Sequence, residues 1–132
     1  MRVLSYLVFF VLIASLGANG QNSTSWNNFR GSQDLLGTTN VNFPDKPKKL
    51  WSFQVGDNIK SAAVIGEGKI IIGATDGVVY CLDLKGKLVW KYKTENSIEA
   101  PALILNGKVY VGNLDGSFYA IKLSDGKLIW KY

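Results

Sequence analysis

The sequence predicts an all-β protein built from tandem four-stranded units, and three observations lead to this fold class. A seven-residue phrase occurs twice, as GKLVWKY ending at Tyr92 and as GKLIWKY ending at Tyr132. Residues 68–92 and 107–132 match at about half of their positions, with a period of about 40 residues, which is typical of repeat architectures. Gly-containing pairs that favour tight hairpins separate short apolar runs inside each copy.

The first 20 residues have the pattern of a secretory signal peptide. A basic Arg2 precedes an apolar run from Val3 to Leu16, and the small residues Ala18 and Gly20 follow it. The run is shorter than the roughly 20 residues that a spanning helix needs, so we expect cleavage after Gly20 and export to the periplasm or the extracellular space. The alternative is an uncleaved membrane anchor.

Residues 21–49 are expected to form an extended segment before the repeats. This segment contains the phrase WNNFRG, from Trp26 to Gly31. It also contains a formal glycosylation sequon at Asn22, which matters only in a eukaryotic secretory route.

Composition disfavours several kinds of chemistry. The 132 residues contain no histidine and only one cysteine, Cys81, so the usual general base, a disulfide within the chain and a cysteine-based metal cluster are all missing. The formal net charge is +5, but the lysines are spread over turns and strand ends with acids between them. This distribution favours an ordinary solvated surface over a nucleic-acid or anionic membrane partner. We expect no nucleic acid and, after signal cleavage, no membrane span.

Each copy of the repeat divides into four strands. The first unit covers residues 59–92 and the second covers residues 98–132. The expected strands are 60–66, 69–74, 78–84 and 87–92, followed by 100–105, 108–113, 117–123 and 127–132. Turn pairs such as Asp76-Gly77 and Asn106-Gly107 lie between them, because tight hairpins need positive φ, which glycine adopts freely.

The third strand of the second unit has two apolar faces. Tyr119 and Ile121 point to one side, and Phe118 and Ala120 point to the other. A sheet that is apolar on both sides suits stacking between neighbouring sheets. Each unit is therefore interpreted as one blade of a β-propeller, in which four-stranded sheets surround a central channel.

These residues resemble the PQQ-like (quinoprotein-type) repeat family, which includes quinoprotein alcohol dehydrogenases and outer-membrane assembly factors of the BamB kind. The family's docking pattern of a small residue, a glycine and a tryptophan is matched twice, although Lys122 stands where the family usually has Asp and the first copy's turn is one residue shorter. WNNFRG is similar to the family's opening motif. The matching residues are Cys81, Gly86 and Trp90 in the first blade, and Ala120, Gly126 and Trp130 in the second.

The resemblance implies that these tryptophans dock one blade onto the next. Each indole would lie flat over the small residue of the neighbouring docking pattern and donate its N–H to a backbone acceptor. Trp51, Trp90 and Trp130 are therefore interpreted as docking residues and not as ligand-stacking residues. Cys81 is interpreted as a small buried filler, with a reactive thiol as the alternative.

Residues 50–56 repeat the closing phrase of a blade, with Trp51 at the tryptophan position. In the family such a first strand commonly completes the last blade. Because propellers typically have about 4 to 8 blades, one closing strand and two blades make an incomplete ring. We expect the sequence to be the N-terminal part of a longer protein whose remaining blades complete the ring. Assembly of several short chains is the alternative.

The sequence favours a non-catalytic, exported propeller that binds a protein or polymer, because every residue singled out has a structural role. No catalytic, cofactor-binding or metal residue can be assigned. The alternative is the N-terminal portion of a PQQ-dependent quinoprotein dehydrogenase, for which the resemblance implies PQQ, Ca²⁺, an Asp base and often adjacent cysteines. An extracellular sensor or carbohydrate-linked module is a third class, which differs from the first only in its partner.

Overall fold

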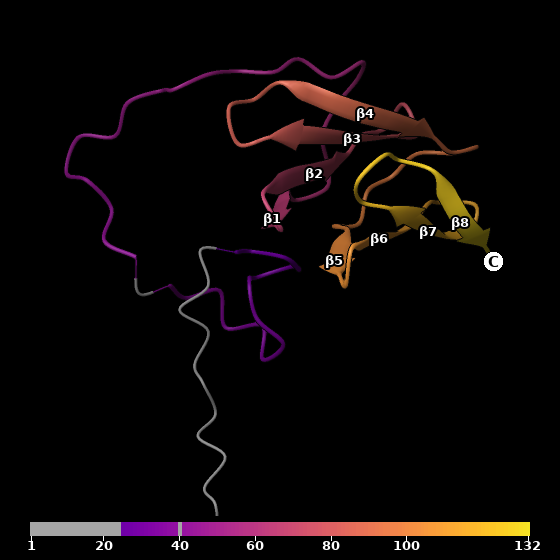
Figure 1. The fold of residues 1–132 in the computed structure, drawn as a ribbon, viewed down its shortest axis with the longest axis horizontal. Helices are drawn as coiled ribbons and strands as arrows, with labels where there is room; N and C mark the ends of the chain where they lie inside the picture. The colour runs from indigo at the N-terminus through magenta and orange to yellow at the C-terminus, as the bar shows by residue number, and fades with distance from the viewer. Residues whose placement is uncertain (1–24, 40) are drawn as a thin grey trace, which may run out of the picture.

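The computed structural model describes residues 25–39 and 41–132, and its regular structure is entirely β (Figure 1). This confirms the predicted fold class. The proposed signal peptide at 1–20 and the sequon at Asn22 lie outside the described residues. Within the described ranges no helix has the length and apolar character required to cross a membrane.

Eight strands form two four-stranded antiparallel sheets, each in the order of the sequence. The first sheet, or first blade, consists of β1 (Val64–Gly66), β2 (Lys69–Gly73), β3 (Val78–Asp83) and β4 (Leu88–Lys93). The second blade consists of β5 (Leu103–Leu105), β6 (Lys108–Gly112), β7 (Phe118–Lys122) and β8 (Leu128–Lys131).

The turns follow the chemistry that the sequence indicates. In the β1–β2 turn Glu67 and Gly68 have φ of 50° and 73°, and in the β5–β6 turn Asn106 and Gly107 have φ of 50° and 70°. Positive φ at both central residues defines the two-residue hairpin turn whose twist matches the strands. Glu67 adopts this conformation although glutamate lacks the short side chain that makes it easy for Asn or Asp.

The two blades also share an irregularity. Their outer strands shift register between Cys81 and Leu82 in the first blade and between Ala120 and Ile121 in the second. The shift follows directly after the pairs Cys81–Trp90 and Ala120–Trp130. A bulge bends and twists a strand, so the sequence repeat is reproduced as a repeat in backbone shape.

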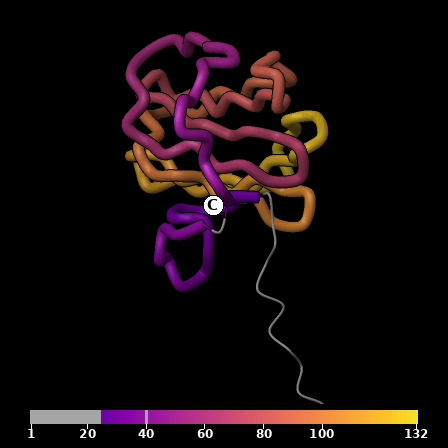
Figure 2. The backbone as a smooth tube through the Cα atoms, turned by 90° about the vertical axis from the view of Figure 1, so that its left-hand side faces the viewer, coloured from indigo at the N-terminus to yellow at the C-terminus, as the bar shows by residue number. Residues whose placement is uncertain are grey.

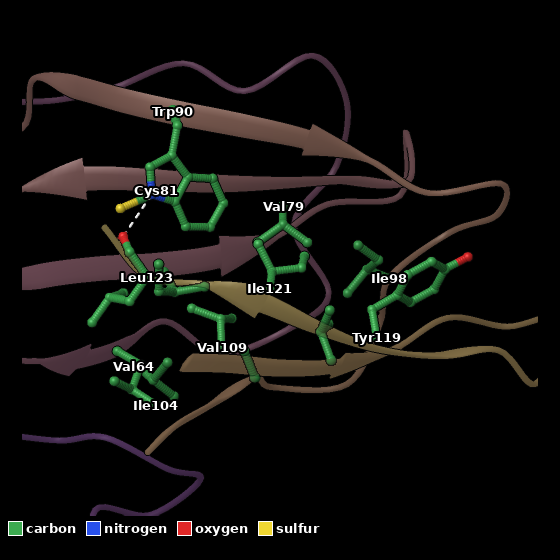
Figure 3. Packing of buried hydrophobic residues seen from close by; sticks show 13 residues of the cluster. Val64, Val79, Cys81, Trp90, Ile98, Ile104, Val109, Tyr119, Ile121 and Leu123 are labelled. Carbon is green, nitrogen blue, oxygen red and sulfur yellow. Dashed lines mark hydrogen bonds between the residues drawn. The ribbon is translucent and has the colours of Figure 1, made fainter. Parts of the chain in front are cut away.

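The blades pack face to face around one shared core. Figure 3 shows side chains of both sheets meeting between them, including Val79 and Trp90 from the first blade and Val109 and Ile121 from the second. Strands β1 and β5 lie against each other, and the sheets fan apart toward β4 and β8 (Figure 1). In a propeller the strands that converge in this way border the central channel, so β1 and β5 are the inner strands.

The expected closing strand at residues 50–56 is not a strand in the structure. A strand needs hydrogen bonds to a neighbour, and within the described ranges no segment forms a ladder with these residues. They lie in the connecting segment that runs past the first blade (Figures 1 and 2). Their Trp51 nevertheless reaches the first blade, in the manner described below.

Candidate functional site

The clearest contact between the blades is that of Trp90 with the β7–β8 turn. The indole of Trp90 lies over Gly126, where a Cβ atom would come within 2.7 Å of the ring. Its N–H donates a hydrogen bond of 2.8 Å to the carbonyl oxygen of Leu123 (Figure 3). Trp90 is only 8% exposed, so a large apolar ring is buried and its polar N–H keeps an acceptor.

Trp51 makes the equivalent contact one repeat earlier. Its ring lies over Gly86, where a Cβ atom would come within 2.4 Å, and its N–H donates to the carbonyl oxygen of Leu84 at 3.2 Å. Both hydrogen bonds join residues 33 positions apart. The connecting segment thus places a tryptophan on the first blade as the first blade places Trp90 on the second.

The indole lies over the glycine of the docking pattern, whereas the resemblance implied that it lies over the small residue. Cys81 and Ala120 lie opposite Trp90 and Trp130 within their own sheets. The glycines at 86 and 126 have φ of 80° and 74°, which a side chain rarely adopts, and any side chain there would collide with the ring. The docking role of these residues stays a prediction, which the Trp90 and Gly126 variants in the Discussion test.

Trp130 has no blade to cover it among the described residues. It is 42% exposed and lies with Phe118, Lys131 and Tyr132 around an open hollow of about 520 Å³. Its ring contacts those of Tyr110 and Phe118, with centroids 6.1 and 6.0 Å away. The outer face of the second blade is therefore aromatic and open.

A second set of repeated contacts joins aromatic residues. Phe53 meets Tyr80 with ring centroids 5.9 Å apart, and Tyr92 meets Tyr119 at 6.0 Å. The hydroxyl of Tyr80 donates to Asp76 at 2.7 Å. Burial and, after it, this hydrogen bond raise the pKa of Tyr80. Tyr80 and Tyr119 are both buried.

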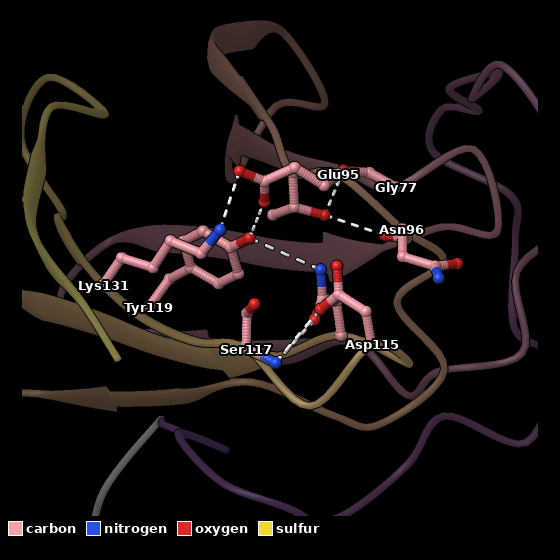
Figure 4. A network of polar contacts seen from close by, with 9 residues as sticks. Gly77, Glu95, Asn96, Asp115, Ser117, Tyr119 and Lys131 are labelled. Atoms are coloured by element: carbon pink, nitrogen blue, oxygen red, sulfur yellow. Dashed lines mark hydrogen bonds and ion pairs between the residues drawn. The ribbon is translucent and has the colours of Figure 1, made fainter.

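The second blade replaces the Asp76 contact by a network around Glu95 (Figure 4). The hydroxyl of Tyr119 donates to Glu95, and the Lys131 ammonium donates to the same carboxylate at 2.8 Å. These hydrogen bonds, that from Lys131 first, lower the pKa of Glu95 to about 2. The Lys131 ammonium also lies 5.5 Å from the centre of the Tyr119 ring. The network ties the connection between the blades to β7 and β8.

The thiol of Cys81 is fully buried. Burial raises its pKa to about 11, although the charge of Lys69 opposes the shift. A thiol of this kind carries little thiolate at neutral pH, so it fits the role of a buried filler better than that of a nucleophile.

The N-terminal motif lies against the inner strands, a position that the sequence did not indicate. Trp26 and Ile65 exchange backbone hydrogen bonds of 2.6 and 2.7 Å, and the Ile104 N–H donates to the Asn27 carbonyl oxygen at 2.8 Å. The Trp26 ring lies over Gly31, whose φ is 81°. The segment Trp26–Asn27 therefore bridges β1 and β5 on the side of the expected channel.

No cluster of three or more His, Cys, Asp or Glu that could hold a metal ion occurs within residues 25–39 and 41–132.

Stacked four-stranded sheets that converge on inner strands and are joined by indole contacts define part of a β-propeller. The sequence profile of the family described as outer membrane protein assembly factor BamB matches residues 41–132. The chain belongs to this family of PQQ-like repeat proteins. No curated protein gives a significant match to the chain.

Solved structures support the fold. BamB from Moraxella catarrhalis is 28% identical with a TM-score of 0.59, over 63% of this chain and 27% of its own. The quinohemoprotein alcohol dehydrogenase from Comamonas testosteroni is 20% identical with a TM-score of 0.73, over 87% of this chain and 20% of its own. The quinohemoprotein alcohol dehydrogenase ADHIIG from Pseudomonas putida HK5 is 26% identical with a TM-score of 0.54, over 61% of this chain and 14% of its own. The chain spans about a quarter of the BamB structure and a fifth or less of the dehydrogenases.

Proposed function

We propose that the chain is part of an exported, non-catalytic β-propeller that binds a protein or polymer through its loops and ring face. The observation that carries the proposal is the position of Trp26 and Asn27 on the inner strands. A quinoprotein would need the channel for its cofactor, whereas here Trp26 and Asn27 form backbone hydrogen bonds with the inner strands at Ile65 and Ile104. A scaffold needs only the loops and faces.

The internal use of the recurring side chains also supports a scaffold. The indole N–H groups of Trp51 and Trp90 are hydrogen-bonded to backbone carbonyls, and the hydroxyls of Tyr80 and Tyr119 to carboxylates. Side chains held in this way build the fold, and the exposed loops between strands are free to make contacts. The export step rests on the predicted cleavage after Gly20.

The alternative function is a part of a PQQ-dependent dehydrogenase, favoured by the 26% identity to ADHIIG, which is close to the 28% identity to BamB. Titration of the full-length protein with PQQ and CaCl₂ separates the two. A scaffold should show no saturable cofactor absorbance and no alcohol-dependent reduction of an electron-acceptor dye. Saturable binding together with dye reduction would establish the dehydrogenase and end the scaffold proposal.

Site-specific photo-crosslinking in the producing cell tests the scaffold directly. A crosslinker at Asn96 or Leu114, both exposed in the loops, should give a discrete adduct. The same crosslinker at Lys91, exposed on the outer strand β4, is the matched control. Adducts of equal yield at all three positions would indicate random collision and contradict a loop-specific partner.

A further inference from the structure

The lysines that are scattered along the sequence gather at one end of the structure. This end, called the lysine end, carries the β1–β2, β3–β4, β5–β6 and β7–β8 turns. The register places Lys69 opposite Asp83 in the first blade and Lys108 opposite Lys122 in the second, all beside these turns. The lysines of the end are Lys69, Lys85, Lys87, Lys108, Lys122 and Lys127.

Contacts between the blades show that the turns of both blades lie at the same end. The Glu67 carboxylate in the β1–β2 turn accepts a hydrogen bond of 3.1 Å from the Gly107 N–H in the β5–β6 turn. Trp90, the third residue of β4, lies over Gly126 in the β7–β8 turn. The lysines of the two blades therefore form one surface.

The acids at the lysine end are already engaged. Asp83 accepts the backbone N–H groups of Lys85 and Lys87 at 2.9 and 2.8 Å. Asp125 lies 3.7 Å from Lys122 and 4.0 Å from Lys127. Glu67 binds the neighbouring turn.

The lysine end thus carries six lysines and three acids. Lys85 and Lys87 have no ion-pair partner in the part of the chain that the structure describes. The opposite end has the reverse balance, with three lysines and five acids. They are Lys60, Lys93 and Lys131 with Asp57, Asp76, Glu95, Glu99 and Asp115.

The connecting segment adds to the same surface. Lys46, Lys48 and Lys49 are exposed and come shortly before Trp51, which lies on the β3–β4 turn. The positive charge is therefore concentrated where the segment joins the first blade.

Exposed leucines lie among these lysines and favour lipid over a soluble polyanion. Leu84, 56% exposed, directly precedes Lys85, and Leu105, 45% exposed, directly precedes the β5–β6 turn. Apolar side chains beside ammonium groups match the boundary between lipid headgroups and acyl chains. A nucleic acid or polyphosphate would be recognised by charge and would gain nothing from the leucines.

We propose that the lysine end docks on an anionic lipid surface. The lysine ammonium groups face the headgroup phosphates, and Leu84 and Leu105 enter the headgroup layer. The repeat supports this arrangement, because Lys69 corresponds to Lys108 and Lys87 to Lys127, so each blade presents the same charges. The proposal goes beyond the scaffold function and holds for either function considered above.

Vesicle co-sedimentation of the full-length protein tests the proposal. The test variant is Lys85→Gln/Lys87→Gln/Lys127→Gln, and the matched control is Lys60→Gln/Lys91→Gln/Lys93→Gln, which removes the same charge away from the lysine end. Both retain the N-terminal apolar run, so its contribution cancels. On vesicles of phosphatidylglycerol and phosphatidylcholine at physiological salt, the test variant should bind at least about tenfold more weakly than wild type, and the control within about twofold.

Three further arms complete the experiment. On pure phosphatidylcholine vesicles wild type and both lysine variants should bind equally, at the level set by the N-terminal apolar run. Leu105→Ser should weaken vesicle binding and leave binding to soluble polyphosphate unchanged. Equal losses in the two lysine variants, equal binding to both kinds of vesicle, or an unchanged Leu105→Ser variant would each overturn the proposal.

Discussion

Trp90 and Gly126 form the smallest unit of the architecture, an indole and the glycine beneath it. The positive φ of Gly126 and the 2.7 Å approach of a Cβ atom to the ring are two separate requirements for glycine. Gly107 has nearly the same φ, 70°, but a Cβ atom there would meet nothing within 4 Å. A comparison of Gly126 with Gly107 therefore separates the cost of backbone strain from the cost of losing the indole contact.

Gly126→Ala should lower the free energy of unfolding more than Gly107→Ala. Both substitutions carry the cost of a left-handed alanine, about 1 to 2 kcal/mol, and Gly126→Ala adds about 1 to 3 kcal/mol for the collision with Trp90. Urea unfolding followed by circular dichroism measures both values. Equal losses of unfolding free energy in the two variants would mean that the Trp90 indole moves aside without cost.

Trp90→Ala should destabilise the protein by about 3 to 5 kcal/mol, because a buried ring and its hydrogen bond to Leu123 are lost. Trp130→Ala is the matched control at the equivalent position of the second blade, where the ring is 42% exposed. In the same unfolding experiment Trp130→Ala should lower the free energy of unfolding clearly less than Trp90→Ala does. A negligible effect of Trp90→Ala would refute the docking role of these tryptophans.

The connections between elements carry contacts that neither blade contains alone. Glu95 follows β4 and binds Tyr119 in β7 and Lys131 in β8. Its counterpart in the first blade is the contact of Tyr80 with Asp76 and the Gly56 N–H, the latter at 3.0 Å. The same tyrosine position is thus held by different partners in the two blades.

Glu95→Gln should reduce stability at neutral pH, and the difference from wild type should disappear in acid. The pKa of Glu95 is lowered from 4.5 to about 2 in the folded protein, so its carboxylate stabilises the fold above pH 4.5 and loses this effect as the pH falls toward 2. Thermal unfolding between pH 2 and pH 7 measures the difference. A stability difference between Glu95→Gln and wild type that is independent of pH would rule out the charge of Glu95 as its cause. Asp45→Asn, on the exposed connecting segment, is the control variant.

The N-terminal segment should protect the inner strands from hydrogen exchange. Trp26→Pro removes the N–H that binds Ile65 and the ring that lies over Gly31, so the amides of Ile65 and Ile104 should exchange faster. The amide of Ala120, in the middle of the second blade, is the internal control. Unchanged exchange at Ile65 and Ile104 would show that the segment does not close the inner edge.

At the scale of the whole molecule, the two blades leave an open face. Phe118, Trp130 and Tyr132 are exposed on the second blade, and such an apolar face marks an interaction surface or a site of self-association. In the propeller arrangement a further blade would cover this face.

Residues 1–132 on their own should therefore self-associate as their concentration rises. Trp130→Glu places a charge in the aromatic hollow and should shift the distribution toward monomer in sedimentation velocity. Lys91→Glu, exposed on β4, is the control for added negative charge. A monomer at all concentrations in wild type would contradict the prediction.

Local sequence was sufficient for the number and order of the strands in each blade, the turns and the repeat. The inner strands β1 (Val64–Gly66) and β5 (Leu103–Leu105) are shorter than the expected ranges 60–66 and 100–105. Gly68 and the pair Asn106-Gly107 favour the positive φ that their turns adopt, and the spacing of Trp90 and Trp130 reveals the period before any contact is known. The strand expected at residues 50–56 stays a prediction, because a strand needs a neighbour and no segment within the described residues pairs with it.

The sequence by itself determined the all-β repeat and the spacing of its tryptophans, because turn angles and apolar alternation depend on residues close together in the chain. Only the tertiary structure decided that Trp26 and Asn27 bridge the inner strands and that Trp51 lies at the end that carries Lys85 and Lys127. These placements depend on how the two sheets pack and where the connecting segment crosses them. Residues far apart in the chain carry no local signal of such proximity.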